Sequence, residues 1–255
     1  MIKFTLWLIG AAALASQPIL AQQDSRKTVE QSIEWVSVNS NLTLTRRLSI
    51  LLDGQFRQVN QLDPQQYQAR TALEVKLNDH FSIIPLGYVY TWNYQYGKQP
   101  ADFVNHEHRV WQQVAYKHKI GRIHFEHRLR SEQRFLQHHT SNNGEVSYDG
   151  YSDIQYRGRY RFSARVPLNG TKIESGTYFV SVYDEVFASR GKNITYHKPD
   201  QNRVFAGLGY QFDKSFTLQG GFLYQMLLKS GGTLQENNFG VQVQFLYNID
   251  LTHTH

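Results

Sequence analysis

Arginine recurs at every second position near the middle of the chain. In the segment 153–166, one set of alternate positions holds aromatic, aliphatic or small residues, and the other holds Arg157, Arg159, Arg161 and Arg165. Only a β-strand places alternate residues on one face, because a helix repeats every 3.6 residues. Guanidinium groups aligned in this way can form planar, bidentate pairs with carboxylates, or they can bind anionic solutes.

Charged residues occupy one face of several other segments with the same alternation. Both signs of charge occur, and arginine strongly outnumbers lysine among them. In a narrow barrel such groups would either cross-link and fill the lumen, or line a pocket or pore that favours a small polar or anionic solute. The candidate lumen-lining residues are Arg70, Glu74, Glu107, Arg109, Glu126, Arg128, Arg130, Glu132, Arg134, Arg157, Arg159, Arg161, Arg165, Glu185 and Arg203.

The arginine-rich face is expected to point into the lumen. On the lipid-facing side of a membrane strand, each Arg or Lys near the midplane costs about 2–4 kcal/mol. The expected partners of these arginines are Glu126 and Glu132 on the preceding strand, or Glu185 on the next. We therefore expect Glu126→Gln or Glu132→Gln to destabilise the barrel.

A second candidate for chemistry is the segment 138–144, which reads His-His-Thr-Ser-Asn-Asn-Gly. Its His139 and Ser141 resemble the active-site segment of outer-membrane lipid hydrolases, in which a histidine activates a serine nucleophile. However, Asn-Asn-Gly is typical of a loop, and no third member of a triad can be assigned. We interpret 137–150 as a loop and the protein as non-enzymatic, with a lipid or lipopolysaccharide hydrolase as the alternative.

The spacing of the histidines does not predict a metal site. His106 and His108 share one face of a segment, and His124 and His127 lie on the next segment. Imidazole suits transition metals, but no compact set of carboxylates accompanies these residues, and the chain has no cysteine. The sequence also lacks a phosphate-binding loop, a nucleotide fingerprint and a nucleic-acid motif. We expect no metal, no cofactor and no nucleic-acid partner.

Strand alternation is clear in eleven segments. Many of them reach or exceed the roughly 9–11 residues that cross a membrane, against a usual length of about 5–6 residues in soluble proteins. Their connections alternate between tight turns and longer polar loops, an asymmetry typical of outer-membrane barrels. The expected strands are 33–44, 48–59, 67–77, 81–96, 104–120, 122–136, 154–166, 175–188, 201–212, 216–228 and 237–250.

The strand lengths favour a transmembrane, antiparallel, up-and-down β-barrel over a soluble sandwich or lectin-like domain, whose apolar face would turn inward. Tyr90, Trp92, Tyr94 and Tyr96 alternate along one strand and suit an aromatic girdle at the membrane interface. Single-chain bacterial barrels have even numbers of strands. We therefore expect a weak extra strand within 23–32, which gives twelve strands. The alternative is ten strands, without the segment 33–44.

The first residues read as an export signal. Lys3 precedes a largely apolar stretch at 4–20, and Ala21 ends a small-residue cleavage site. We expect a signal peptide at 1–21 and a single outer-membrane barrel domain at 22–255. No later segment reaches the roughly 18 consecutive apolar residues of a membrane helix. The net charge of +6 fits anionic lipid headgroups but does not require them.

Short charged and aromatic motifs follow one another along most of the chain. They are EHRVW at 107–111, HRLRSEQRF at 127–135, RYRF at 159–162, DEVF at 184–187, DQNR at 200–203 and GLGY at 207–210. Their order resembles a Gram-negative family of unknown function whose members are expected to form outer-membrane β-barrels. The resemblance implies this fold and the cell outer membrane as the location, and it implies no activity and no site residues.

The expected partners of such a barrel are outer-membrane lipid, lipopolysaccharide and, during insertion, the barrel-assembly machinery. Three roles remain open from the sequence. The barrel could be structural, it could bind or pass a small solute, or it could be an accessory barrel that binds another envelope protein.

Overall fold

The computed structural model describes residues 26–60, 62–96, 103–142, 145–192, 194, 199–229 and 231–252. None of them lies in a helix that is long and apolar enough to cross a membrane. The expected signal peptide, residues 1–21, lies outside the described residues. The strands are β1 (Lys27–Thr43), β2 (Leu48–Val59), β3 (Asp63–Lys76), β4 (Phe81–Asn93), β5 (Asn105–Ile120), β6 (Ile123–Asn142), β7 (Glu145–Tyr151), β8 (Gln155–Pro167), β9 (Thr177–Arg190), β10 (Pro199–Gln211), β11 (Phe216–Leu228) and β12 (Leu234–Asp250).

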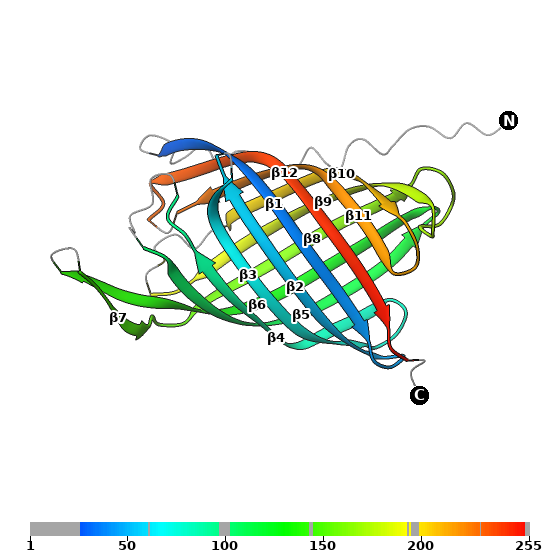
Figure 1. Cartoon of the computed structure of the whole chain (residues 1–255), viewed down its shortest axis with the longest axis horizontal. Coiled ribbons are helices and arrows are strands. Elements are labelled where there is room, and N and C mark those ends of the chain that lie inside the picture. Colours follow the sequence, from blue (N-terminus) through cyan, green and yellow to red (C-terminus); the bar gives the residue numbers. More distant parts are fainter. Residues whose placement is uncertain are drawn as a thin grey trace.

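All strands except β7 form one closed barrel (Figure 1). Around the ring the order is β5, β4, β3, β2, β1, β12, β11, β10, β9, β8 and β6, and β6 pairs with β5 to complete it. Every neighbouring pair in the ring is antiparallel except β1 and β12. The predicted all-β barrel is therefore confirmed, and its strands are antiparallel, as predicted, at every pair but this one.

The ring closes through a parallel seam between β1 and β12. The two strands stay in register from Lys27 opposite Leu234 to Thr43 opposite Asp250. An odd number of up-and-down strands brings the last strand back alongside the first in the same direction, so one parallel pair is unavoidable. The predicted total of twelve strands is confirmed, but the prediction of a separate strand within 23–32 was wrong. Residues 27–32 instead extend β1.

The one strand outside the ring, β7, belongs to a hairpin that projects from the barrel (Figure 1). It pairs with the end of β6, from Asn142 opposite Glu145 to Gln137 opposite Tyr151. The interpretation of 137–150 as a loop was therefore wrong. A hairpin outside the barrel has no face that must be apolar, so the alternation stops although the backbone pairing continues. The Asn-Gly pair at 143–144 is a strong sequence signal for a two-residue hairpin turn.

The two ends of the barrel differ. Tight connections join β1 to β2, β3 to β4, β5 to β6 and β10 to β11 at one end, which we call the turn end. The longer β8–β9 connection, 168–176, lies at the turn end as well, next to the end of β10. The β6–β7 hairpin lies at the opposite end, where β4, β9 and β11 also end, and we call it the loop end.

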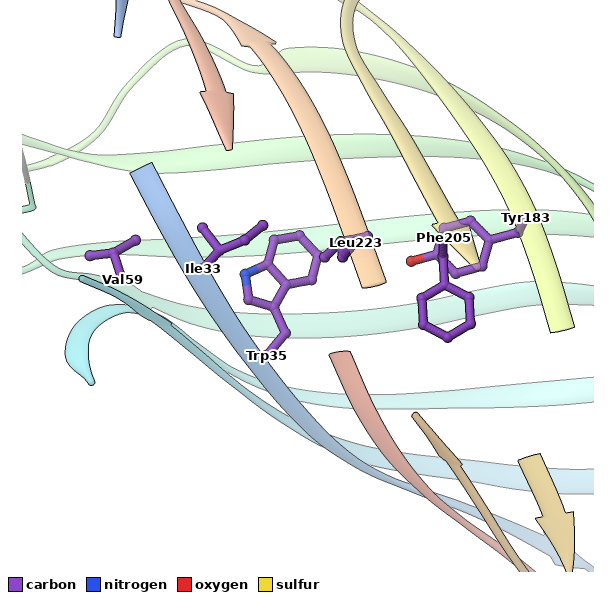
Figure 2. Close-up of a cluster of buried hydrophobic side chains, with 6 residues drawn as sticks. All are labelled: Ile33, Trp35, Val59, Tyr183, Phe205 and Leu223. Atoms are coloured by element: carbon purple, nitrogen blue, oxygen red, sulfur yellow. The ribbon is translucent and has the colours of Figure 1, made fainter. Parts of the chain in front are cut away.

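The outer and inner faces of the barrel have opposite character. Among buried residues, polar and charged side chains outnumber apolar ones. The apolar minority includes a cluster of Ile33, Trp35, Val59, Tyr183, Phe205 and Leu223 (Figure 2). Every strand of the ring, in contrast, exposes a large apolar or aromatic side chain, as at Val38, Leu52, Leu73, Leu86, Val114, Leu129, Tyr160, Val182, Leu208, Phe222 and Val241.

Candidate functional site

Glu132 on β6 is fully buried in the barrel interior and is surrounded by guanidinium groups. Its carboxylate oxygens lie 2.5 Å from Nη2 of Arg157 and 2.6 Å from Nη1 of Arg159, both on β8. Arg109 and Arg130 place nitrogens at 3.6 and 4.0 Å. The strand register brings these groups together, because Glu132 is directly opposite Arg157 and alternate residues of a strand share one face.

Two further buried carboxylates, Glu107 on β5 and Glu185 on β9, join the same network. An oxygen of Glu107 lies 2.6 Å from Nε of Arg134 and 2.8 Å from Nη2 of Arg109. Arg109 therefore links Glu107 to Glu132, and Arg159 links Glu132 to Glu185. The oxygens of Glu185 lie close to three arginines, Arg128 at 2.6 Å, Arg159 at 2.9 Å and Arg203 at 3.7 Å.

Positive charge exceeds negative charge in this network. Three carboxylates face seven arginines, an excess of four positive charges. Arg57 raises the excess to five, because it forms no ion pair with any carboxylate in the described part of the chain. The seven arginines are Arg109, Arg128, Arg130, Arg134, Arg157, Arg159 and Arg203.

Arg57, which our sequence interpretation missed, lies on the face of an indole ring. Its guanidinium carbon is 4.2 Å from the centroid of the Trp35 ring, and its nitrogens donate to Gln55 at 2.7 Å and to Gln66 at 2.6 Å. Arg203 lies over the same ring at 4.8 Å. Cation–π contacts of this kind stabilise a desolvated cation. The alternation of Asp53, Gln55 and Arg57 along β2 is the sequence signal that could have identified it.

Arg130 has a similar environment on the other side of the network. It lies 3.7 Å from the centroid of the Trp111 ring and donates to Gln113 at 2.8 Å. The Trp111 ring in turn covers Gly87 on β4, where an added Cβ would come within 2.2 Å of the ring. Gly87 therefore makes room for Trp111, and Trp111 supports Arg130.

Two cavities in the barrel interior are lined by described residues. The turn-end cavity has a volume of about 300 Å³, and the loop-end cavity has a volume of about 500 Å³. Four residues line both cavities and lie between them, and we call them the divide. They are Trp35, Arg57, Arg159 and Arg203.

Within the described residues, the remaining predicted residues form no ion pair with the three buried carboxylates, although Arg161 is directly opposite Glu185. Arg70 pairs with Asp53 at 3.1 Å, and Glu74 accepts a hydrogen bond from Ser82 at 2.8 Å. Two more form a looser group near the turn end, where Glu126 lies 3.5 Å from Arg161 and 3.8 Å from Lys117. Arg165 is in register with His124 of β6.

A small group closes the loop-end cavity on one side. Tyr96, from the segment after β4, donates to Glu236 of β12 at 3.2 Å and accepts from Lys229 at 3.3 Å. Lys229 and Glu236 form an ion pair at 2.8 Å. Burial raises the pKa of Tyr96, which keeps its hydroxyl protonated as a donor. The expectation that Tyr96 belongs to an outer aromatic girdle was wrong, because β4 ends at Asn93 and the chain then turns inward.

Three histidines considered in the sequence contact aromatic side chains. His108 bonds to the hydroxyls of Tyr88 and Tyr151 at 2.5 and 2.6 Å, and His127 bonds to that of Tyr160 at 2.8 Å. No group of three or more metal-binding side chains occurs within the described ranges. His139 packs on Phe103, with 3.9 Å between ring centroids. Ser141 belongs to β6, opposite Val146.

Comparisons with known proteins identify one family. The model of a family described as a protein of unknown function (DUF2490) matches residues 34–236, which agrees with the resemblance seen in the sequence motifs. No curated protein and no solved structure matches the chain.

Proposed function

The chain belongs to the family of unknown function DUF2490, and from the geometry of its barrel we propose that it is a non-enzymatic outer-membrane protein whose divided lumen binds small anions. The observation that supports this proposal is the excess of arginine in the interior. Five guanidinium charges of the network have no carboxylate to balance them.

Unbalanced charge of one sign is unfavourable in a poorly solvated interior, because neighbouring like charges repel and each has lost part of its hydration. Both cavities share this imbalance. Seven arginines and two carboxylates line the turn-end cavity. Six arginines, Lys229 and one carboxylate line the loop-end cavity. A small anion that enters either cavity would relieve the repulsion and accept the free guanidinium hydrogens.

The outer face supports the outer membrane as the location. Its exposed apolar side chains come from every strand of the ring, and so large a continuous apolar surface is unfavourable in water. A closed barrel has no unpaired strand edge and can satisfy its backbone hydrogen bonds within a bilayer. The expected export signal agrees with this location, and lipid and lipopolysaccharide are then the surrounding partners.

Cysteine labelling tests the assignment of the two faces. Phe222 and Leu223 are neighbours on β11, but they are 79% and 2% exposed. The chain contains no native cysteine to interfere. We expect Phe222→Cys to react with a maleimide confined to the lipid phase and Leu223→Cys to remain unlabelled by it. Equal labelling of both variants from the lipid would contradict the proposed membrane face.

Thermal unfolding tests anion binding. At constant ionic strength, phosphate at a hundred times its Kd should stabilise the folded barrel by about 2.7 kcal/mol relative to chloride. For a chain of this size, the expected rise in the unfolding midpoint is about 5–10 °C. The control pair is Arg57→Gln, which should reduce the rise, and Arg46→Gln on the exposed β1–β2 turn, which should leave it unchanged. An identical midpoint in both salts would show that the lumen holds no anion.

A further inference from the structure

The turn-end cavity has one apolar stretch of wall. Leu51, Ala72, Gly87 and Trp111 lie directly opposite one another across β2, β3, β4 and β5. The Trp111 ring covers Gly87 and carries Arg130 over its face, and Leu51, Ala72 and Trp111 of the row line the cavity. Ile84 packs into the same cluster, and Leu51 lies against it.

A different arc of the same cavity is cationic. Arg128, Arg161, Glu185 and Arg203 form a second row of directly paired residues across β6, β8, β9 and β10. This row carries three positive charges and one negative charge. Within the described part of the chain, the buried Nε of Arg161 has no hydrogen-bond partner, and neither has Nε1 of Trp111.

We infer that the turn-end cavity binds amphipathic anions, which have a carboxylate at one end and a small apolar body. The cationic row would bind the carboxylate, because guanidinium groups bind carboxylates through paired, charge-assisted hydrogen bonds. The apolar row would contact the body, because each apolar group removed from water strengthens binding. This inference rests on the proposed function and specifies its ligand class.

Tryptophan fluorescence can follow this binding. In a Trp92→Phe variant without the expected signal peptide 1–21, Trp35 and Trp111 remain as reporters, and both line the cavity. The probes are acetate, butyrate and hexanoate at constant ionic strength, with phosphate and neutral hexanol for comparison. We expect the Kd of the carboxylates to fall about fourfold for each added methylene, and we expect hexanol to bind far more weakly than hexanoate.

Two neighbouring leucines provide a matched pair of variants. Leu51 belongs to the apolar row, and Leu52 faces outward and is 43% exposed. Leu51→Ala should weaken hexanoate binding about tenfold and leave acetate binding unchanged, and Leu52→Ala should change neither. Arg161→Gln should weaken the binding of acetate, butyrate and hexanoate alike. Unchanged unboiled gel mobility would confirm that each variant is folded.

The outcomes separate this inference from the proposed function. If acetate, hexanoate and phosphate bind equally well, the lumen binds anions but the amphipathic ligand class is wrong. If hexanol binds as tightly as hexanoate, the cationic row has no role and the inference fails. If no anion changes the fluorescence or the unfolding midpoint, both proposals fail.

Discussion

Glu132→Gln should lower the free energy of unfolding by about 3–5 kcal/mol, the range for removing one partner of a buried ion pair. The substitution keeps the size of the side chain but leaves four arginines around an uncharged amide. The excess of positive charge in the network rises from five to six. Urea unfolding in detergent, followed by gel mobility of unboiled samples, measures the change.

Glu126→Gln is the matched control. The Glu126 side chain is 21% exposed, and its ion-pair contacts are longer, at 3.5 and 3.8 Å. Partly solvated pairs of this kind contribute about 1 kcal/mol or less. The sequence suggested that either substitution would destabilise the barrel, and the structure separates them. Phosphate should also recover part of the stability lost in Glu132→Gln. Equal effects of the two substitutions would contradict the account of the network.

Gly240→Ala should prevent closure of the barrel. Gly240 of β12 faces Ile33 of β1 across the parallel seam. A Cβ at this position would lie 1.7 Å from the Ile33 carbonyl oxygen and 2.6 Å from its carbonyl carbon. Side-chain overpacking costs about 1–3 kcal/mol, and a backbone obstacle that cannot rotate away should cost more. The expected result is loss of the heat-modifiable band and of urea-resistant structure.

Gly54→Ala tests whether the seam, and not glycine in general, causes the effect. Gly54 lies on β2, and nothing approaches its added Cβ within 4 Å. We expect this variant to fold with wild-type mobility. Folding of Gly240→Ala with unchanged stability would show that β1 and β12 do not pair in the register described.

The alternation of the sequence predicted the strands because the barrel has an apolar outer face and a largely polar inner face. Neighbours such as Tyr160 and Arg159 differ sharply in their free energy of transfer from water to an apolar environment. The residue types of each strand therefore show which face points outward. The number of strands in the ring could not be predicted in this way. Closure by a parallel seam depends on how the ends of the chain meet, and the sequence of β1 contains no signal for the direction of its second neighbour.

The arginines and glutamates were visible in the sequence, but their arrangement was not. Glu132 pairs with Arg157 and Arg159 because of the register between β6 and β8. Alternation alone does not determine that register, because a shift by two residues keeps every side chain on the same face. Trp35 and Trp111 were missed because only charged side chains were taken as candidates for the lumen. Trp35 is two residues from Ser37, and Trp111 is two residues from Arg109, so each shares the polar face of its strand. This spacing could have placed both tryptophans in the lumen. The role of these residues in solute binding stays a prediction.

Planar-bilayer recording tests the central claim, a membrane barrel with a divided, cationic lumen, most directly. The wild-type protein should insert and show no steady current, because Trp35, Arg57, Arg159 and Arg203 separate the two cavities. Trp35→Ala should join the cavities, and under a KCl gradient its reversal potential should show preference for chloride. A steady wild-type current, or a Trp35→Ala current that favours potassium, would contradict the account.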